Sequence, residues 1–472
     1  MNKKVVSNFF YQGSYQLLTL LLPMITIPIV SHALGAQGIG LYQYIGSIVY
    51  YFVLVAGLGI ANYGIREIAS VRDDRKKLSE RFWELELFNA FIALIMIMLY
   101  LVCISFLPNK LFFLISGISL LATLFDITWF YSGIEDFKAI TSASFLVKIV
   151  SFLAIVILIK DQNDLVKYFI IQSSSVLLTN VVLWLFIFKR VDFTKVSLKH
   201  SMKHFFPALH YFLGKIAITL YTTLNKTLLG MLASTAAVGL YFNSLQLTTI
   251  FVALIGTLDT VLLPYMTNLY THDGKEKMVH LMKRTLHLQL YFSIPLMFGI
   301  IATNQKLIPW FFGDSFQYIR YTVPVLAPLV VVMPLGVSIV RQYLIPMNHI
   351  HKFNVSVIGS AIVSVMINVI LIPVVGIWGA VLATLIAELL VTVIRVVDLI
   401  RTSDFSFDMK KISIYLVGGL LMWLTIYIVT ADMTPTLTTT LLQVVIGVIV
   451  YLSFTTILSV NPIFELLSIK KK

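Results

Sequence analysis

Apolar runs long enough to cross a bilayer follow one another along almost the whole 472-residue chain. A transmembrane helix needs about 20 predominantly apolar residues, and the connections between these runs are short. The pattern therefore predicts an all-α polytopic membrane protein with about 14 transmembrane helices. The expected spans are residues 9–31, 40–62, 83–106, 111–131, 141–160, 165–188, 204–229, 237–263, 285–303, 320–345, 354–373, 377–397, 411–430 and 438–459.

Composition supports the same class. The chain is 58% hydrophobic and 12% charged, whereas soluble domains carry about 25% charged residues. Cys103 is the single cysteine, so an intrachain disulfide and a cysteine-based metal site are both excluded. The sequence has no G-x-x-x-x-G-K-[ST] phosphate loop. We expect no metal, no cofactor and no enzyme activity, since little length remains for a soluble catalytic domain.

The formal net charge of +13 comes from basic residues in short loops between the apolar runs. This distribution argues against nucleic acid as a partner and is typical of the positive-inside rule. It predicts that both termini are cytoplasmic. Outside connections would hold Lys110, Lys160, Lys167, Lys306 and Arg320, and four cations would lie inside spans, namely Lys148, Lys215, Lys226 and Arg341.

Two of these cations share one helix. Lys215 and Lys226 are eleven residues apart, which returns to nearly the same face and separates them by about 16 Å along the axis. Tyr211 and Thr222 fall on that face as well. A lysine near the bilayer centre costs about 2.5 to 3.5 kcal/mol, so the pair indicates a water-filled cavity or an anionic partner. Snorkelling to the headgroups is the alternative, above all for Lys226.

The other intramembrane charges leave two interpretations each. Arg341 is either a second-half cation or an anchor at the cytoplasmic helix end. Asp126 either pairs with Lys148 or takes part in ion coupling. Glu388 shares a helix face with Arg395, so it is either an ion-coupling group or part of a structural pair. Asp259, near the inner end of span 237–263, is a weaker candidate.

The basic segment 189–203 divides the first twelve spans into six plus six. We therefore expect an N-terminal lobe at 1–188, a cytoplasmic linker at 189–203, a C-terminal lobe at 204–397 and a final pair of helices within 411–460. The repeated Gly-Leu-Tyr at Gly40–Tyr42 and Gly239–Tyr241 supports related halves, which transporters often place around a substrate path. Span 320–345 contains Pro324, Pro328 and Pro334, which predict kinks.

Three stretches resemble Wzx-type polysaccharide repeat-unit flippases. They are Ile27–Gly35 followed by Gly38–Tyr42, the segment Tyr63–Ala69, and Asp126–Phe137. Length, fourteen spans and the basic linker fit the same family across the whole chain.

This resemblance implies a member of the multidrug/oligosaccharidyl-lipid/polysaccharide exporter superfamily, with two six-helix lobes around a central cavity and two peripheral helices within 411–460. The implied activity is flipping of undecaprenyl-pyrophosphate-linked oligosaccharide to the outer leaflet of the bacterial cytoplasmic (inner) membrane for capsule, exopolysaccharide or O-antigen. Alternating access would be coupled to protons or sodium. A polysaccharide polymerase and a chain-length regulator are implied partners.

The residues expected to bind substrate are Lys215, Lys226, Lys148, Arg66 and Arg341, and those expected to couple ions are Asp126 and Glu388. Arg66 enters through the family-like segment, with a plain positive-inside role as its alternative. The main rival function is an ion-coupled small-molecule (multidrug) exporter of the same superfamily, which we expect to use acidic and aromatic groups. A membrane glycan polymerase is a more distant rival.

Overall fold

The computed structural model describes the backbone of residues 3–462, and within that range all side chains except those of 3–17, 20, 213–215, 217, 218, 220 and 221. Every regular element in this part of the chain is helical, which confirms the all-α fold class. The chain divides into two compact units, Met1–Thr227 and Leu228–Lys472. This division falls inside a single helix, α9. The lobe and linker limits expected from the sequence stay a prediction.

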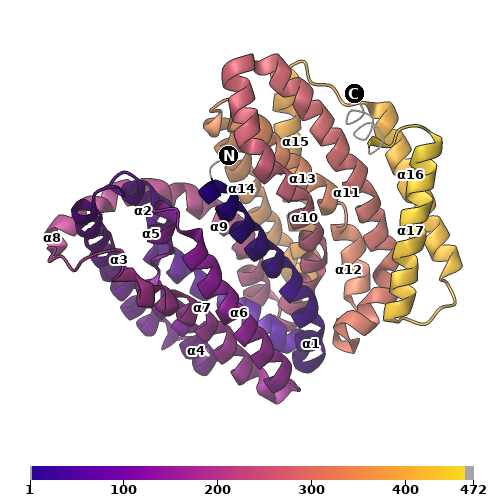
Figure 1. Cartoon of the computed structure of the whole chain (residues 1–472). Helices are drawn as coiled ribbons and strands as arrows, with labels where there is room; N and C mark the ends of the chain where they lie inside the picture. The colour runs from indigo at the N-terminus through magenta and orange to yellow at the C-terminus, as the bar shows by residue number, and fades with distance from the viewer. Residues whose placement is uncertain (1–2, 463–472) are drawn as a thin grey trace. The chain divides into compact units, whose positions relative to one another are not determined.

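The first unit contains the helices up to the greater part of α9 (Figure 1). Spans one and two are not separated by a loop, because one helix continues through Gly35, whose φ of 63° breaks the helical geometry at one residue. Glycine accepts this left-handed conformation without steric cost. The elements are α1 (Lys3–Ala56), α2 (Ile60–Ala69), α3 (Arg75–Ile104), α4 (Lys110–Leu121), η1 (Ala122–Phe125), α5 (Thr128–Gly133), α6 (Phe137–Leu158), η2 (Gln162–Asp164), α7 (Leu165–Ile187), α8 (Leu198–Ser201), η3 (Met202–His204) and α9 (Phe205–Leu232).

An aromatic core holds this unit together where α3 and α5 meet. Trp129, Phe130 and Tyr131 are buried, although they occupy one six-residue helix. Phe82 of α3 stacks on Trp129 with ring centroids 5.7 Å apart and meets Phe130 edge-on at 5.0 Å. Such pairs add about 0.5 to 1.5 kcal/mol beyond the apolar area they bury. The short α5 is therefore fixed by tertiary packing more than by its own hydrogen bonds.

The second unit is built around two unusually long helices. The elements α10 and α11 have 39 and 38 residues and join at Gly274, whose φ is 87°. The tenth span is interrupted after α12, and Pro328 caps α13 at the break. The elements are α10 (Thr235–Asp273), α11 (Lys275–Phe312), η4 (Asp314–Phe316), α12 (Ile319–Leu326), α13 (Leu329–Ile339), the π-helical turn η5 (Val340–Leu344), α14 (Ile350–Val375), α15 (Ile377–Thr402), α16 (Met409–Val429) and α17 (Leu437–Ile457).

The last two helices lie at one edge of the second unit, as expected for the final pair of spans. In Figure 1, α16 and α17 run side by side, and both pack against α11. Tyr291 of α11 lies between Tyr415 and Tyr451, with ring centroids 5.3 Å from each. The Tyr451 hydroxyl donates to the backbone oxygen of Tyr291 at 2.9 Å. This tyrosine cluster attaches the pair to the unit, together with Lys306 of α11, which donates to the Ala431 oxygen in the α16–α17 connection at 2.8 Å.

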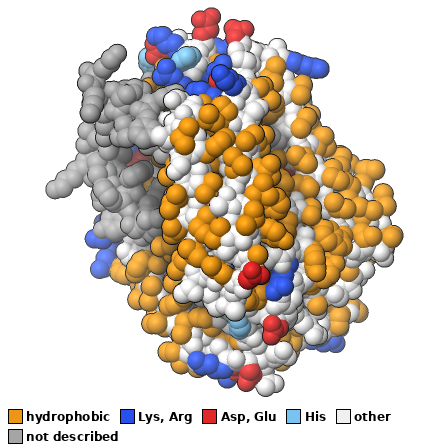
Figure 2. Space-filling model, turned by 90° about the vertical axis from the view of Figure 1, so that its right-hand side faces the viewer, with side chains coloured by type: hydrophobic (Ala, Val, Ile, Leu, Met, Phe, Trp, Pro, Cys, Tyr) orange, Lys and Arg blue, Asp and Glu red, His pale blue; other side chains and the backbone are white. Residues whose placement is uncertain are grey.

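The helices expose apolar faces that only a lipid environment suits. In the described part of the chain, eleven helices are long and apolar enough to cross a membrane, and Leu21–Ala69 alone extends over 49 residues. Figure 2 shows hydrophobic side chains across the middle of one face and charged side chains gathered toward its two ends. Helix α14 shows the exposed apolar spacing best, with Val355, Ile358, Ile362, Met366, Val369 and Ile370. The protein is a multi-pass membrane protein.

One close contact between α2 and α9 depends on a glycine. Gly59 precedes α2 with φ of 75°, and a Cβ built there would overlap the Ala208 carbonyl oxygen and lie 2.8 Å from the Phe212 nitrogen. Any larger residue must therefore separate the two backbones and adopt a left-handed conformation that costs about 1 to 2 kcal/mol by itself.

We expect Gly59→Ala to lower the melting temperature of the purified protein in detergent and to reduce its folded yield. The matched control is Gly46→Ala on α1, where an added Cβ meets no atom within 4 Å. Because alanine is favoured over glycine within a helix, the control should match or exceed the wild type. Equal melting temperatures for the two variants would contradict the packing described.

Candidate functional site

Helix α9 meets α1 through polar side chains. Lys226 donates from Nζ to Oε1 of Gln43 at 3.2 Å. The neighbouring Thr227 hydroxyl lies 2.8 Å from that of Ser47 and 3.0 Å from that of Tyr51. Gln43, Ser47 and Tyr51 are four residues apart, so they form one polar face of α1. The Lys226 ammonium is thus half-buried in the first unit and directed at a polar helix face.

A second cation contacts α9 nearer its start. Arg66 of α2 donates to the Tyr211 hydroxyl at 3.0 Å, and the rings of Tyr63 and Tyr211 lie 5.9 Å apart. Tyr211 and Lys226 are fifteen residues apart, which is about 22 Å along a helix. We name Tyr211, Thr222 and Lys226, with their partners Arg66 and Gln43, the α9 polar face. Lys215 falls in α9 between these levels, but its side chain lies outside the described residues.

The start of α9 is anchored by a charge network around Glu84 of α3. Glu84 is 7% exposed, and its carboxylate lies 2.9 Å from Lys203 Nζ, 3.3 Å from His204 Nε2 and 3.4 Å from Arg81 Nε. His204 Nδ1 is also 2.7 Å from the Tyr63 hydroxyl. Arg81 contacts Glu67 of α2 as well. Because a buried carboxylate needs such partners, this network ties α2, α3 and the entry of α9 into one arrangement.

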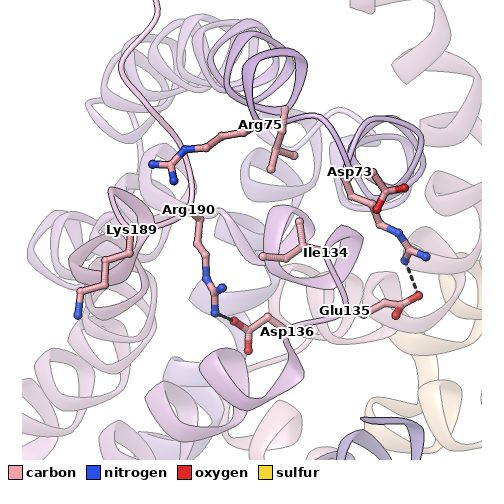
Figure 3. Close-up of a pocket in the computed structure, with 9 residues that line it drawn as sticks. Asp73, Arg75, Ile134, Glu135, Asp136, Lys189 and Arg190 are labelled. Atoms are coloured by element: carbon pink, nitrogen blue, oxygen red, sulfur yellow. Dashed lines mark hydrogen bonds and ion pairs between the residues drawn. The ribbon is translucent and has the colours of Figure 1, made fainter. Parts of the chain in front are cut away.

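The connections α2–α3, α5–α6 and α7–α8 meet at a pocket of about 540 Å³. Arg190 points at Asp136 with a nitrogen–oxygen distance of 2.6 Å, and Arg72 binds Glu135 at 2.6 Å (Figure 3). Arg75 forms a bidentate salt bridge with Asp192, with nitrogen–oxygen distances of 2.8 and 2.9 Å. This contact lowers the pKa of the Asp192 carboxyl. Because each arginine faces a carboxylate, the pocket is better suited to joining three loops than to binding an anion.

Asp126 occupies a helix break in the fourth span. Its Oδ1 accepts from the backbone nitrogen and the hydroxyl of Thr128 at 3.0 and 2.6 Å. Its own backbone oxygen accepts from the Trp129 indole at 2.8 Å. These contacts tie Asp126 to the first residue of α5 and to one of its aromatic side chains, while the N-cap residue of α5, Ile127, makes no side-chain cap hydrogen bond. Lys148 is half-buried on α6. The ion-coupling role expected for Asp126 stays a prediction.

In the second unit, Arg341 is half-buried on the π-helical turn η5, and Glu388 is half-buried on α15. Arg395 is buried on α15, donating to the Ser356 hydroxyl and the Gly336 oxygen at 3.1 Å each. Of the expected substrate contacts, Lys226 is on α9, and Arg66 of α2 contacts α9 through Tyr211. Lys148 belongs to another helix of the first unit, whereas Arg341 and Glu388 belong to the second unit.

Sequence reasoning missed several buried acidic groups. Glu84 and Glu86 begin the expected span 83–106, and Glu86 is 5% exposed with no hydrogen-bond partner at Oε2. Asp259 received little weight, yet it is 1% exposed at the centre of a polar cluster. The signal that could reveal the two glutamates is the presence of a carboxylate within an apolar run, the same signal that marks the intramembrane cations.

Residues 5–270 match a family described as polysaccharide biosynthesis protein. This match covers more than half of the 472 residues. The chain belongs to that family. The matched region includes the α9 polar face. The family resemblance predicted from the sequence is confirmed.

Individual relatives of this chain have names that describe transport of glycans. A protein named as an O-antigen transporter in Escherichia coli (strain K12) is 21% identical over 395 residues, covering 82% of this chain and 94% of that protein. A flippase named for low-salt glycan biosynthesis in Haloferax volcanii is 22% identical over 228 residues, 48% of each chain.

Solved structures share the fold of this chain. The lipid II flippase MurJ in an inward closed conformation has a TM-score of 0.76 and 17% identity, with 96% of this chain and 98% of that chain covered. An inward-facing multidrug resistance MATE family transporter of the MOP superfamily has a TM-score of 0.58 and 12% identity, with 88% and 98% covered.

We expect Glu84→Gln to destabilise the first unit by about 1.5 to 3 kcal/mol, because Lys203 and Arg81 would lose a charged acceptor. Thermal unfolding of the purified protein measures the effect. The control is Glu276→Gln, an exposed glutamate in the first turn of α11, which should change stability by less than about 0.5 kcal/mol. A wild-type melting temperature in Glu84→Gln would show that the network is dispensable.

Proposed function

We propose that this protein is a flippase that moves undecaprenyl-pyrophosphate-linked oligosaccharide repeat units from the cytoplasmic to the outer leaflet for surface polysaccharide assembly. The observation that carries the proposal is Lys226, a cation on the α9 polar face, in a chain of the polysaccharide biosynthesis family. The protein acts as a transporter and catalyses no covalent step. It resides in the bacterial cytoplasmic membrane, with both termini cytoplasmic as the loop charges predict.

The names of the relatives support this cargo. They describe an O-antigen transporter, a flippase of glycan biosynthesis and a lipid II flippase. A lipid-linked glycan joins a polar glycan to an apolar chain, and such a substrate needs a polar path beside lipid. Exposed apolar helix faces meet lipid, so the prenyl chain can stay in the bilayer while the headgroup passes along polar side chains.

The charges of the α9 polar face suit a pyrophosphate. A cation placed in a low-dielectric environment is expensive unless it meets an anion, and attraction between opposite charges is strongest there. Lys226 donates to an amide oxygen, and Arg66, which is exposed, donates to a phenol hydroxyl. An incoming phosphate would offer each of them a charged acceptor and a stronger hydrogen bond. Lys215, Lys148 and Arg341 are further proposed contacts.

Transport by alternating access between the two proposed lobes, 1–188 and 204–397, is driven by an ion gradient in this proposal. Asp126 and Glu388 are the coupling candidates inferred from the sequence. A polysaccharide polymerase and a chain-length regulator are the proposed partners, since a flipped repeat unit must be polymerised outside the membrane.

Complementation of a flippase-null strain tests the proposal, with surface polysaccharide and the leaflet location of the lipid-linked oligosaccharide as readouts. Wild type should restore export. We expect Lys226→Ala to reduce export about tenfold to a hundredfold, as the loss of a charged hydrogen bond predicts, and Lys215→Ala combined with Lys226→Ala to reduce it further. Lys226→Arg, which keeps the charge, should retain part of the activity.

The control is Lys277→Ala, because Lys277 is exposed at the start of α11 and pairs with Asp273 on the surface. It should export like wild type at matched expression. If wild type leaves the glycan lipid on the inner leaflet in several glycan backgrounds, the flippase proposal fails and the small-molecule exporter becomes the leading candidate. Full export by the double variant would remove α9 from the substrate path.

A further inference from the structure

A cluster of three hydroxyl groups joins α1 to α9 beside Lys226. The Ser47 hydroxyl of α1 lies 2.8 Å from the Thr227 hydroxyl of α9, and the Tyr51 hydroxyl of α1 lies 3.0 Å from the same Thr227 oxygen. We name these three residues, which all belong to the first unit, the hydroxyl cluster. Ser47 and Thr227 are buried, with exposed fractions of 3% and 5%, whereas Tyr51 is half-buried. The cluster therefore ends at a side chain that stays partly accessible.

The direction of each hydrogen bond in the hydroxyl cluster follows from counting protons. A hydroxyl group has one proton to donate and lone pairs that accept. Ser47 donates to the Tyr44 carbonyl oxygen at 2.6 Å, and since a carbonyl oxygen only accepts, the Ser47 proton is used there. Thr227 must then donate to Ser47. Tyr51 must in turn donate to Thr227, so its proton is used as well.

The Tyr51 oxygen is consequently the terminal acceptor of the cluster. Because its own proton is directed at Thr227, this oxygen can only accept a hydrogen bond from a ligand. A ligand group that meets Tyr51 must carry a hydrogen atom on oxygen or nitrogen. An ionised phosphate oxygen carries none and would face lone pairs. While the cluster is intact, Tyr51 thus favours a hydroxyl or an amide N–H over a phosphate.

The opposite chemistry is found at Gln43 and Lys226. The Lys226 ammonium can only donate, and it lies 3.2 Å from Gln43 Oε1. This contact fixes the orientation of the amide, because the atom that faces an ammonium must be the oxygen. The Gln43 Nε2 group, which only donates, is left at the other end of the amide. Both groups at this level therefore suit acceptor atoms, which a phosphate supplies.

The two levels are separated along one face of α1. Gln43 and Tyr51 are eight residues apart, which corresponds to about 12 Å along a helix. The side chains of Gln43, Tyr51 and Lys226 are all half-buried. A ligand that meets both levels must be elongated, with hydrogen-bond acceptors at one end and donors at the other. A pyrophosphate with an attached sugar has this order, because phosphate oxygens accept and sugar hydroxyls donate.

We propose that Tyr51 is a specificity-determining residue, whose oxygen accepts a hydrogen bond from a hydroxyl or amide N–H of the glycan while Lys226 and Gln43 hold the pyrophosphate. The proposal rests on the proposed flippase function and deepens it, since it assigns glycan and pyrophosphate to different levels of α1. A glycan without a donor at this level would leave the Tyr51 oxygen unpaired. A site built to hydrogen-bond a substrate group rejects analogues that lack it for this reason.

Binding of two lipids to the purified full-length protein in detergent tests the assignment. The probes are undecaprenyl pyrophosphate and the undecaprenyl-pyrophosphate-linked oligosaccharide isolated from the strain used for complementation. Tyr51→Phe should weaken binding of the oligosaccharide lipid about twofold to tenfold, as the loss of one neutral hydrogen bond predicts. The same variant should bind undecaprenyl pyrophosphate like wild type, which also shows that it is folded. Lys226→Ala should weaken binding of both lipids, because both carry the pyrophosphate.

Two further variants separate glycan recognition from a structural role of the hydroxyl cluster. Thr227→Val removes the hydroxyl that links α1 to α9 but keeps the Tyr51 phenol, so it should bind the oligosaccharide lipid more tightly than Tyr51→Phe does. Tyr50→Phe is the matched control, because Tyr50 is the preceding residue of α1, is 40% exposed and lies outside the hydroxyl cluster. It should bind both lipids like wild type.

The outcomes distinguish this inference from the flippase proposal. Equal losses for the two lipids in Tyr51→Phe, or no loss for either, overturn the role of Tyr51 and leave the flippase proposal in place. A loss in Thr227→Val as large as that in Tyr51→Phe would show that the hydroxyl cluster acts only through the packing of α1 on α9. If wild type binds neither lipid and restores no export, the flippase proposal fails and this inference fails with it.

Discussion

The absence of water from the bilayer interior is the constraint on which this structure depends. Backbone groups are satisfied within helices, but ionised side chains must find partners inside the protein. Three local solutions are visible in the described residues. Glu84 collects several cations at the start of α9, Lys226 turns to a polar face of α1, and Asp259 is held by serine and glutamine. Each charged group inside the membrane thereby fixes the relation between particular helices.

Helix α9 illustrates how this constraint shapes the first unit. Its start is bound by the Glu84 network and closely approached by Gly59, while Thr227 hydrogen-bonds with α1. The compact first unit therefore reaches to Thr227, well past the basic segment at 189–203. A polar face that is needed for transport has to be held on packed helices, because a path lined by mobile side chains would lose its charge geometry.

The succession of apolar helices could be predicted because lipid-facing helices need long apolar runs, a signal that is local in sequence. Their number agrees only approximately, since the described part of the chain holds eleven helices of spanning length against about 14 expected. The family could be predicted from three short stretches. The Asp259 cluster could not, since Asp259, Thr285, Gln289 and Ser338 are scattered over three helical segments. Spacing along a helix reveals residues of one face, as for Tyr211 and Lys226, but it does not reveal which face of another helix will meet them. Asp126 shows a different limit, because a carboxylate in an apolar run can also be held by local hydrogen bonds, here from Thr128 at the start of α5.

Two kinds of charge divide the tasks in the proposed mechanism. A cationic group suits an anionic headgroup, whereas a buried carboxylate held by hydroxyl and amide groups fixes the helices around it. In the first unit Lys226 donates to an amide oxygen and Arg66 to a phenol hydroxyl, and in the second unit Asp259 accepts from serine and glutamine. Binding of an anionic headgroup beside Lys226 would change the net charge that the bilayer interior must accommodate. Because an uncompensated charge in that interior is costly, the occupied and empty forms of that site differ in free energy. Such a difference is what an ion gradient requires in order to bias one conformation of a transporter over another.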